Sequence, residues 1–143
     1  MNGSNEAQEV RSVIVERQFS APAEKLWRAL TQPHLIEEWL MKNDFVPVAG
    51  HRFNLRRDPS PQISVVIDCE VTEIEPNRTL SYKWNAYGLE SLVTFTLTST
   101  ADGTMLRVEQ AGFRPDQQAA YKGARASWPN FLTSLDALLS RLD

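Results

Sequence analysis

The spacing of apolar residues changes twice along the chain. From residue 10 to residue 19 apolar and polar positions alternate, with Val13, Val15 and Phe19 on one face, and this period of two predicts a β-strand. Over residues 22–40 the apolar positions recur three and four residues apart, which predicts two short helices. Pro33 suits the first turn of the second helix, and Thr31 is expected to cap it.

Alternation returns after residue 44 and continues to residue 113. It predicts five strands, around residues 52–56, 63–74, 80–84, 93–98 and 106–110. The two prolines of residues 58–61 and the pair Asp102-Gly103 predict turns between strands. Because the connections are short, neighbouring strands must be antiparallel.

The last part of the chain, from residue 116 to residue 142, returns to helical spacing. Trp128, Leu135 and Leu142 are among its apolar positions. Pro129 lies inside this stretch, and a proline ring collides with the carbonyl group four residues earlier. We therefore expect a long C-terminal helix that kinks or restarts at this point, with Ser127 as the cap of a restarted helix.

This order of elements predicts an α+β fold in which a curved antiparallel sheet wraps around the long C-terminal helix. The chain has 143 residues, of which 42% are hydrophobic and 23% charged, as is typical of one globular domain. We expect that domain to span residues 10–143, with residues 1–9 as a disordered tail.

Charge and cysteine content narrow the expected partners and location. A net charge of −3 gives no general attraction to nucleic acid. No apolar stretch approaches the roughly 18 residues that a membrane-spanning helix requires. The single cysteine, Cys69, permits no internal disulfide and is compatible with a reducing compartment. We therefore expect a cytoplasmic protein that neither binds nucleic acid nor inserts into a membrane.

Four segments carry a family resemblance, and they occur in the family's order. They are FSAPAEKLWRALTQPHLIEEWL (19–40), IDCEVTEIEPNRTLSYKW (67–84), VTFTLTSTADGTMLRVEQAGF (93–113), and Trp128-Pro129 followed by Leu132 and Leu135. Together they resemble the bacterial SRPBCC proteins of the START-like superfamily. The similarity is greatest to the branch named after activator of heat shock protein 90 ATPase homologue 1.

The resemblance implies a helix-grip (START-like, Bet v 1-like) fold, in which the sheet and the long helix enclose a hydrophobic cavity. That cavity is the part with which members of the family usually work. This chain has Ser127 where the family's Gly-Trp-Pro pattern more often has glycine. The segment between Arg57 and Ile63 is short, which is expected to alter the rim of the cavity.

Residue types that carry chemistry are sparse. His34 and His51 have no ligand partners at a suitable spacing, so we expect no metal site. Cys69 falls on the apolar face of its strand, which is typical of a buried and inert side chain. The adjacent Glu37 and Glu38 point in different directions on a helix, which favours a solvated surface over an acid–base pair. We expect no catalytic residue and no cofactor.

Aromatic side chains are more informative, because six of them are predicted to face inward. They are Trp39, Phe53, Tyr82, Trp84, Phe95 and Trp128. Two interpretations remain open for them, namely plain core packing and the lining of a ligand cavity.

Three polar residues are predicted to share the inward faces of the strands. Gln110 interrupts the apolar face of its strand, and a buried amide must find a partner or border water. Arg17 and Arg57 alternate with inward residues as well, and their long side chains either enter the cavity or extend to its rim. We take the six aromatic residues and Gln110 as the candidate ligand-cavity residues.

Three functional hypotheses follow. The leading one is a small-molecule binding domain that holds an apolar or aromatic ligand in a cavity of roughly 300 to 1,000 Å³, without a cofactor. The family name suggests a second, a co-chaperone-like protein-interaction module with a chaperone as partner. The third is a cofactor-free cavity enzyme, a cyclase, dehydratase or hydrolase like relatives in the wider superfamily. The missing acid–base pair makes an enzyme less expected than a binding protein.

Overall fold

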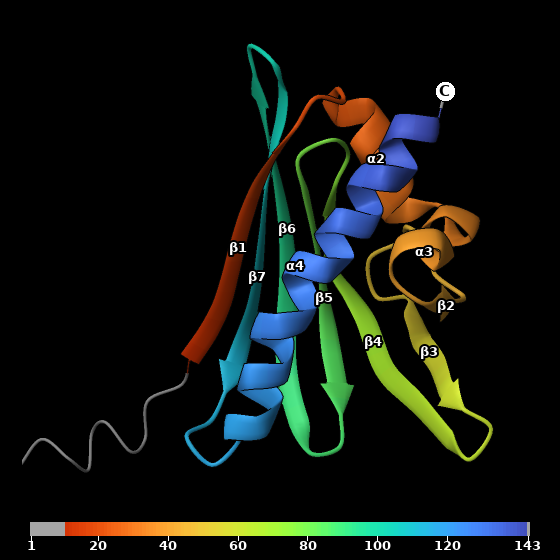
Figure 1. Ribbon diagram of the computed structural model, residues 1–143, viewed down its shortest axis with the longest axis vertical. Coiled ribbons are helices and arrows are strands. Elements are labelled where there is room, and N and C mark those ends of the chain that lie inside the picture. The colour runs from red at the N-terminus through yellow and green to blue at the C-terminus, as the bar shows by residue number, and fades with distance from the viewer. Residues whose placement is uncertain (1–10, 143) are drawn as a thin grey trace, which may run out of the picture.

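A computed structural model describes residues 11–142, which form a curved antiparallel sheet crossed by one long helix (Figure 1). The expected tail, residues 1–9, lies outside the described residues. The elements, in chain order, are β1 (Arg11–Phe19), α2 (Ala23–Thr31), α3 (Pro33–Trp39), β2 (Lys42–Asn43), β3 (Arg52–Ser60), β4 (Ile63–Glu75), β5 (Thr79–Ala86), β6 (Leu89–Thr100), β7 (Gly103–Phe113) and α4 (Gln118–Arg141).

The sheet has the strand order β1-β7-β6-β5-β4-β3-β2, and every neighbouring pair is antiparallel. The first strand therefore joins the sheet beside the last one, while β2 to β7 form a meander. Helix α4 runs diagonally across one face of the sheet, and α2 and α3 pack near its C-terminal half (Figure 1). These features confirm the expected α+β helix-grip architecture.

The core lies between the sheet and α4, because strand alternation sends every second side chain toward the helix. Leu55, Leu80 and Leu106 are fully buried from three different strands, and Leu135 of α4 is fully buried in the same core. No helix among residues 11–142 is long and apolar enough to cross a membrane.

Two details of the sheet differ from the expectation. The two-residue strand β2 was not expected, because it is defined only by the pairing of Lys42 and Asn43 with β3. Strand β3 also runs through Pro59, where a turn was expected. The register between β3 and β4 is irregular from Arg57 to Ser60, and a proline without a donor is tolerated at such an irregularity.

Both expected helix caps were wrong. Helix α4 continues without interruption through Pro129, so Ser127 caps no second helix. Pro129 is exposed, and the carbonyl group that its ring leaves without a partner can therefore bind water. Thr31 does not cap α3 but ends α2, where its hydroxyl donates a hydrogen bond to the carbonyl oxygen of Trp27 at 2.8 Å.

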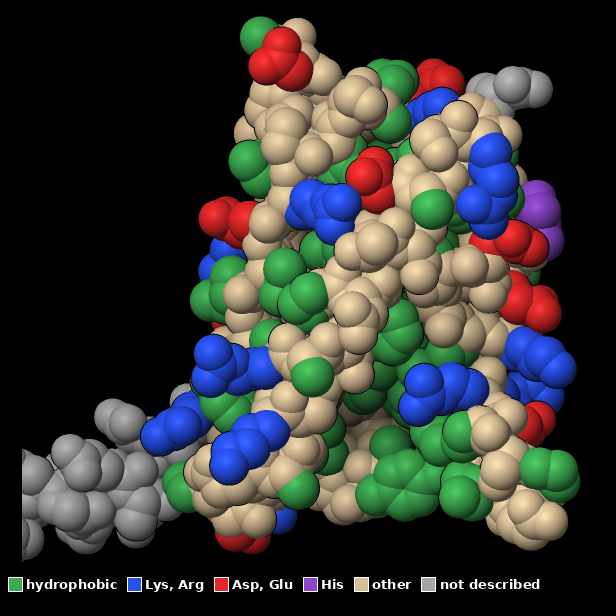
Figure 2. All heavy atoms as spheres, viewed as in Figure 1, with side chains coloured by type: hydrophobic (Ala, Val, Ile, Leu, Met, Phe, Trp, Pro, Cys, Tyr) green, Lys and Arg blue, Asp and Glu red, His purple; other side chains and the backbone are tan. Residues whose placement is uncertain are grey.

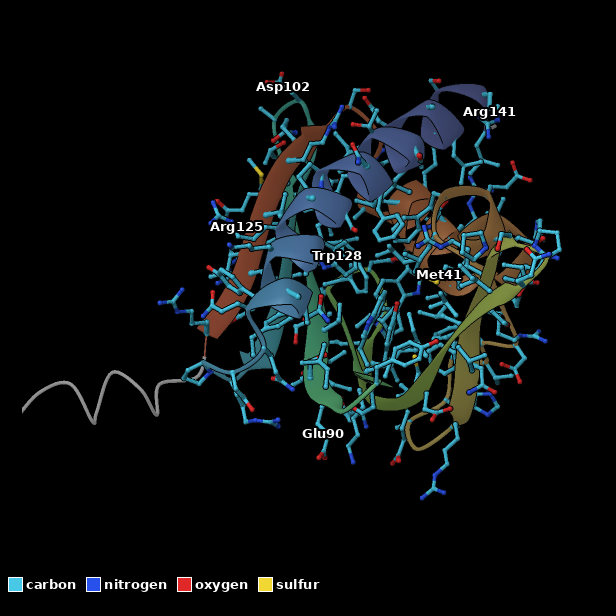
Figure 3. All side chains as sticks on the ribbon, turned by 60° about the horizontal axis from the view of Figure 1, so that its bottom comes forward. Met41, Glu90, Asp102, Arg125, Trp128 and Arg141 are labelled. Atoms are coloured by element: carbon cyan, nitrogen blue, oxygen red, sulfur yellow. The ribbon has the colours of Figure 1, made fainter. Side chains whose placement is uncertain are left out.

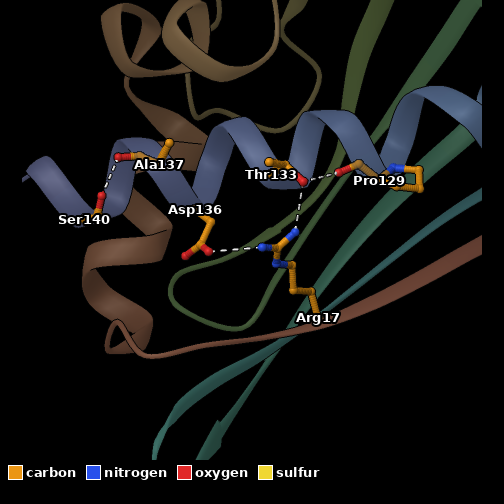
Figure 4. Close-up of polar contacts among 6 residues, drawn as sticks. All are labelled: Arg17, Pro129, Thr133, Asp136, Ala137 and Ser140. Atoms are coloured by element: carbon orange, nitrogen blue, oxygen red, sulfur yellow. Dashed lines mark hydrogen bonds and ion pairs between the residues drawn. The ribbon is translucent and has the colours of Figure 1, made fainter.

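Arg17 connects the edge strand β1 to α4. Its Nη2 atom donates to Asp136 Oδ2 at 3.1 Å, and its Nη1 atom donates to Thr133 Oγ1 at 3.2 Å (Figure 4). The side chains of Arg17 and Asp136 are 35% and 49% exposed, so this contact lies at the surface. Arg17 is not among the residues that line the cavity, and its side chain extends to the surface beside α4.

Candidate ligand cavity

A cavity of about 180 Å³ lies between the inner face of the sheet and the first half of α4. Figure 3 shows this end of the molecule, with Trp128 on α4 and Met41 after α3 both labelled. The space-filling view shows apolar side chains gathered in a hollow between α4 and the β3–β4 end of the sheet (Figure 2). The lining residues are Met41, Arg57, Val65, Ile67, Trp84, Leu89, Gln110, Phe113, Ala120, Ala124, Ser127, Trp128 and Phe131.

Helix α4 contributes both small and large side chains to the lining of this cavity. In the first half the small lining residues are Ala120, Ala124 and Ser127, spaced four and three residues apart and therefore on one face, and Trp128 also lines the space from this half. In the second half the inner face carries large buried residues, among them Leu132 and Leu135. Small side chains leave space between helix and sheet, whereas leucines fill it.

Gln110 is buried and its amide is used within the protein. Its Oε1 atom accepts a hydrogen bond from Trp128 Nε1 at 2.9 Å, and its Nε2 atom donates to Ser91 Oγ at 3.0 Å. The Ser91 hydroxyl in turn donates to the carbonyl oxygen of Trp84 at 2.6 Å. This network links β5, β6, β7 and α4, and it fixes the orientation of the Trp128 ring that borders the cavity.

The structure divides the seven candidate residues into two groups. Trp84, Gln110 and Trp128 line the cavity. The other four are buried in the core and are absent from the lining: Trp39, Phe53, Tyr82 and Phe95.

The aromatic rings of both groups form one connected series. Tyr82 contacts Phe95 with ring centroids 5.8 Å apart, Phe95 contacts Trp128 at 5.9 Å, and Trp128 contacts Trp84 at 5.6 Å. Trp39 packs edge-on against Phe95, and its Nε1 atom donates to the carbonyl oxygen of Ala29 in α2. The core packing and cavity-lining interpretations therefore each describe part of the set.

Buried titratable groups near the core are held in their neutral forms. Burial raises the pKa of the Cys69 thiol to about 12, and the charge of Asp68 acts in the same direction. The thiol is therefore protonated at neutral pH, which makes it a weak nucleophile. Burial likewise raises the pKa of the Tyr82 hydroxyl.

The histidines and acidic residues that the structure describes do not gather into a set of metal ligands. His51 Nε2 lies 3.2 Å from the carbonyl oxygen of Asp44, and its ring stacks on Phe53. Glu38 pairs with Arg141 of α4 at 3.1 Å on the surface. Within residues 11–142, no three histidine, cysteine or acidic side chains converge in a way that could hold a metal ion.

A second hollow, of about 440 Å³, lies on the outer face of the sheet. Its polar groups are largely paired with one another: Arg52 lies 3.5 Å from Glu70, and Asn54 donates to Asp68 at 2.8 Å. The Asp44 carboxylate accepts from the backbone N–H of Asn54. Because these groups already have partners, the inner cavity is the better candidate for a ligand.

Most of the cavity lining was missed from the sequence, and the cavity is smaller than the roughly 300 Å³ that we expected as a minimum. The signal that could have located it is the run of small residues in the first half of α4, at Ala120, Ala124 and Ser127. Arg57 was recognised as an inward position, and the structure places it in the lining.

Comparison with known proteins gives a family for the chain. The family model described as Activator of Hsp90 ATPase homolog 1-like protein matches residues 20–140. Among solved structures, the protein MLL2253 from Mesorhizobium loti is 60% identical with a TM-score of 0.87, over 93% of this chain and 99% of that one. A comparison with curated proteins found no match.

Two further solved structures come from proteins with lower identity. CalU16 from Micromonospora echinospora is 26% identical with a TM-score of 0.77, over 94% of this chain and 80% of that one. DynU16, a protein of the dynemicin biosynthetic locus, is 27% identical with a TM-score of 0.78, over 91% of this chain and 47% of that one. Because the family model spans most of the sequence and a solved structure is 60% identical over nearly its whole length, the chain belongs to the family of Activator of Hsp90 ATPase homolog 1-like proteins, as its sequence resemblance implied.

Proposed function

We propose that the chain is a small-molecule binding domain that holds an apolar or aromatic ligand in the cavity beneath the first half of α4. The observation that carries this proposal is the cavity itself, which is lined by small residues and by Trp128 of α4 and by apolar side chains of the sheet. Family membership supports a domain of the ligand-binding type.

The size and lining of the cavity indicate the size of the ligand. An engineered apolar cavity of about 150 Å³ binds benzene, so a space of about 180 Å³ suits a single aromatic ring or a short aliphatic group. The rings of Trp84 and Trp128 offer apolar contact area to such a group. Gln110 borders the space, but its amide is engaged by Trp128 and Ser91, so we do not expect it to anchor the ligand.

No observation on residues 11–142 favours the co-chaperone-like module or the cavity enzyme over binding. The lining residues of the cavity include no carboxylate, histidine or cysteine. Binding alone is therefore the function that we propose.

Thermal unfolding in the presence of benzyl alcohol, toluene or indole tests this proposal. A ligand that binds only the native state stabilises it by RT ln(1 + [L]/Kd), so the melting temperature should rise with probe concentration. Ala124→Phe should abolish the shift, because a phenyl ring at this lining position occupies the cavity.

Ala126→Phe is the matched control, since Ala126 is exposed on the same helix and does not line the cavity. This variant should retain the shift, and circular dichroism should show both variants folded. Absence of a shift with all three probes, or an equal shift in Ala124→Phe, would contradict the proposal.

A further inference from the structure

The cavity is apolar apart from a few positions, and among residues 11–142 Arg57 is the only charged residue that lines it. Strand alternation explains why this arginine faces the cavity. Within β3, Phe53 and Leu55 are buried on the inner face, and Arg57 follows at the same period of two. It pairs in register with Val65 of β4, which also lines the cavity.

Arg57 is exposed and has no hydrogen bond or ion pair with any side chain in the part of the chain from residue 11 to residue 142. Its neighbour Arg56 has no ion pair within this part of the chain either, whereas three other strand arginines do. Arg17 pairs with Asp136, Arg52 with Glu70, and Arg107 with Glu109. The guanidinium group of Arg57 is thus available at the mouth of the cavity, and no carboxylate of the lining competes for it.

We propose that the ligand is a small aromatic or short aliphatic carboxylate, whose apolar part enters the cavity and whose carboxylate pairs with Arg57. This inference rests on the function proposed above and specifies the class of ligand. A guanidinium group presents a planar fork of N–H donors that matches the two oxygens of a carboxylate. One cation also balances one negative charge, so a monoanion fits this lining better than a dianionic phosphate.

Binding of 3-phenylpropanoate and of 3-phenylpropan-1-ol, measured by calorimetry, tests the inference. The two probes share the ring and the chain and differ in charge. The wild-type protein should bind the carboxylate more tightly than the alcohol, and Arg57→Gln should weaken carboxylate binding by about 3- to 5-fold, the upper part of the range expected for an exposed ion pair. Alcohol binding should stay within about twofold.

Arg56→Gln is the matched control, because Arg56 is the neighbouring exposed arginine of β3 and does not line the cavity. Its register partner is Lys42 of β2, across the backbone pairing of the two strands. It should leave the affinity for both probes unchanged. Raising the salt concentration from about 20 to about 500 mM should weaken carboxylate binding in the wild type but not in Arg57→Gln.

The outcomes separate this inference from the proposed function. If the alcohol binds as well as the carboxylate and Arg57→Gln changes neither, the ligand class is wrong while the cavity still binds. An equal loss in Arg56→Gln would show a general charge effect and would also overturn the assignment to Arg57. If neither probe binds and the neutral probes give no melting shift, the proposed function fails and this inference fails with it.

Discussion

Gln110 lies at the centre of a buried hydrogen-bond network between the sheet and α4. Its side chain is 2% exposed and bonds both Trp128 and Ser91. Gln110→Leu should lower the free energy of unfolding by about 1 to 3 kcal/mol, because the indole N–H of Trp128 then loses its buried acceptor. Urea unfolding measures this change.

A double-mutant cycle provides the control for Gln110. Trp128→Phe removes the donor, so the pair Gln110→Leu and Trp128→Phe leaves no unsatisfied indole N–H. The double variant should therefore lose less stability than the sum of the two single variants. Additive losses would show that the hydrogen bond between them contributes nothing measurable.

Cys69 should make stability fall at alkaline pH. In the unfolded chain the thiol ionises near 9.0, whereas burial raises its folded pKa to about 12. The folded state therefore holds its proton over this interval while the unfolded state loses it, so the stabilisation is complete below pH 9.0 and is lost as the pH rises toward about 12.

The size of the Cys69 effect is bounded by linkage at roughly 1.4 kcal/mol per pH unit for one proton. Urea unfolding at several pH values from about 8 to about 11 should show a shallower decline for Cys69→Ala than for the wild type. Parallel declines would mean that the thiol is not buried as described. Tyr82 contributes to the remaining decline, because burial raises its pKa in the same direction.

For single residues, the sequence predicted which face of the sheet a side chain occupies but not which residues it bonds. Alternation along β7 predicts that Gln110 faces inward, and it does. Its partners lie 19 and 18 positions away, and they reach it only through the pairing of β6 with β7 and the crossing of α4. No local pattern encodes such contacts.

Among the elements, α4 is the one in which local preference and tertiary packing disagree. Proline costs about 3 kcal/mol relative to alanine inside a helix, yet α4 is continuous through Pro129. Pro129→Ala should raise the free energy of unfolding by about 1 to 2 kcal/mol, after the greater freedom of the unfolded alanine chain is subtracted. An unchanged or lowered urea midpoint would show that α4 breaks at this position in solution.

The contact between β1 and α4 should contribute little to stability. Because Arg17 and Asp136 are both substantially exposed, Asp136→Asn should cost less than about 1 kcal/mol. The cost should disappear in concentrated salt, which screens exposed charges. Urea unfolding at low and high salt measures both, and a large cost that persists in salt would contradict this account of the contact.

Hydrophobic period predicted every element except β2, and the short connections predicted that consecutive strands of the meander are antiparallel. The exception has a physical reason, since Lys42 and Asn43 form a strand only by pairing with β3. Pro59 was misjudged for a similar reason, because an irregular register beside it removes the need for its missing donor.

In the whole molecule, the existence of a cavity was implied by the family resemblance, while its position and size were not. They depend on which face of α4 meets the sheet and on how closely the two approach. In the sequence, only the small residues Ala120, Ala124 and Ser127 indicate the position of the cavity. They do so only when it is known which strands face this part of α4. The candidate site was therefore predicted in part, through Trp84, Gln110 and Trp128.

The four tryptophans permit the most direct test of the central claim that this cavity binds a small apolar molecule. Trp84 and Trp128 line the cavity, whereas Trp27 and Trp39 do not. In ¹⁵N-labelled protein titrated with benzyl alcohol, the indole N–H signals of Trp84 and Trp128 should shift with saturation, while those of Trp27 and Trp39 stay in place. Shifts confined to Trp27 or Trp39, or no saturable shift in any of the four, would contradict the claim.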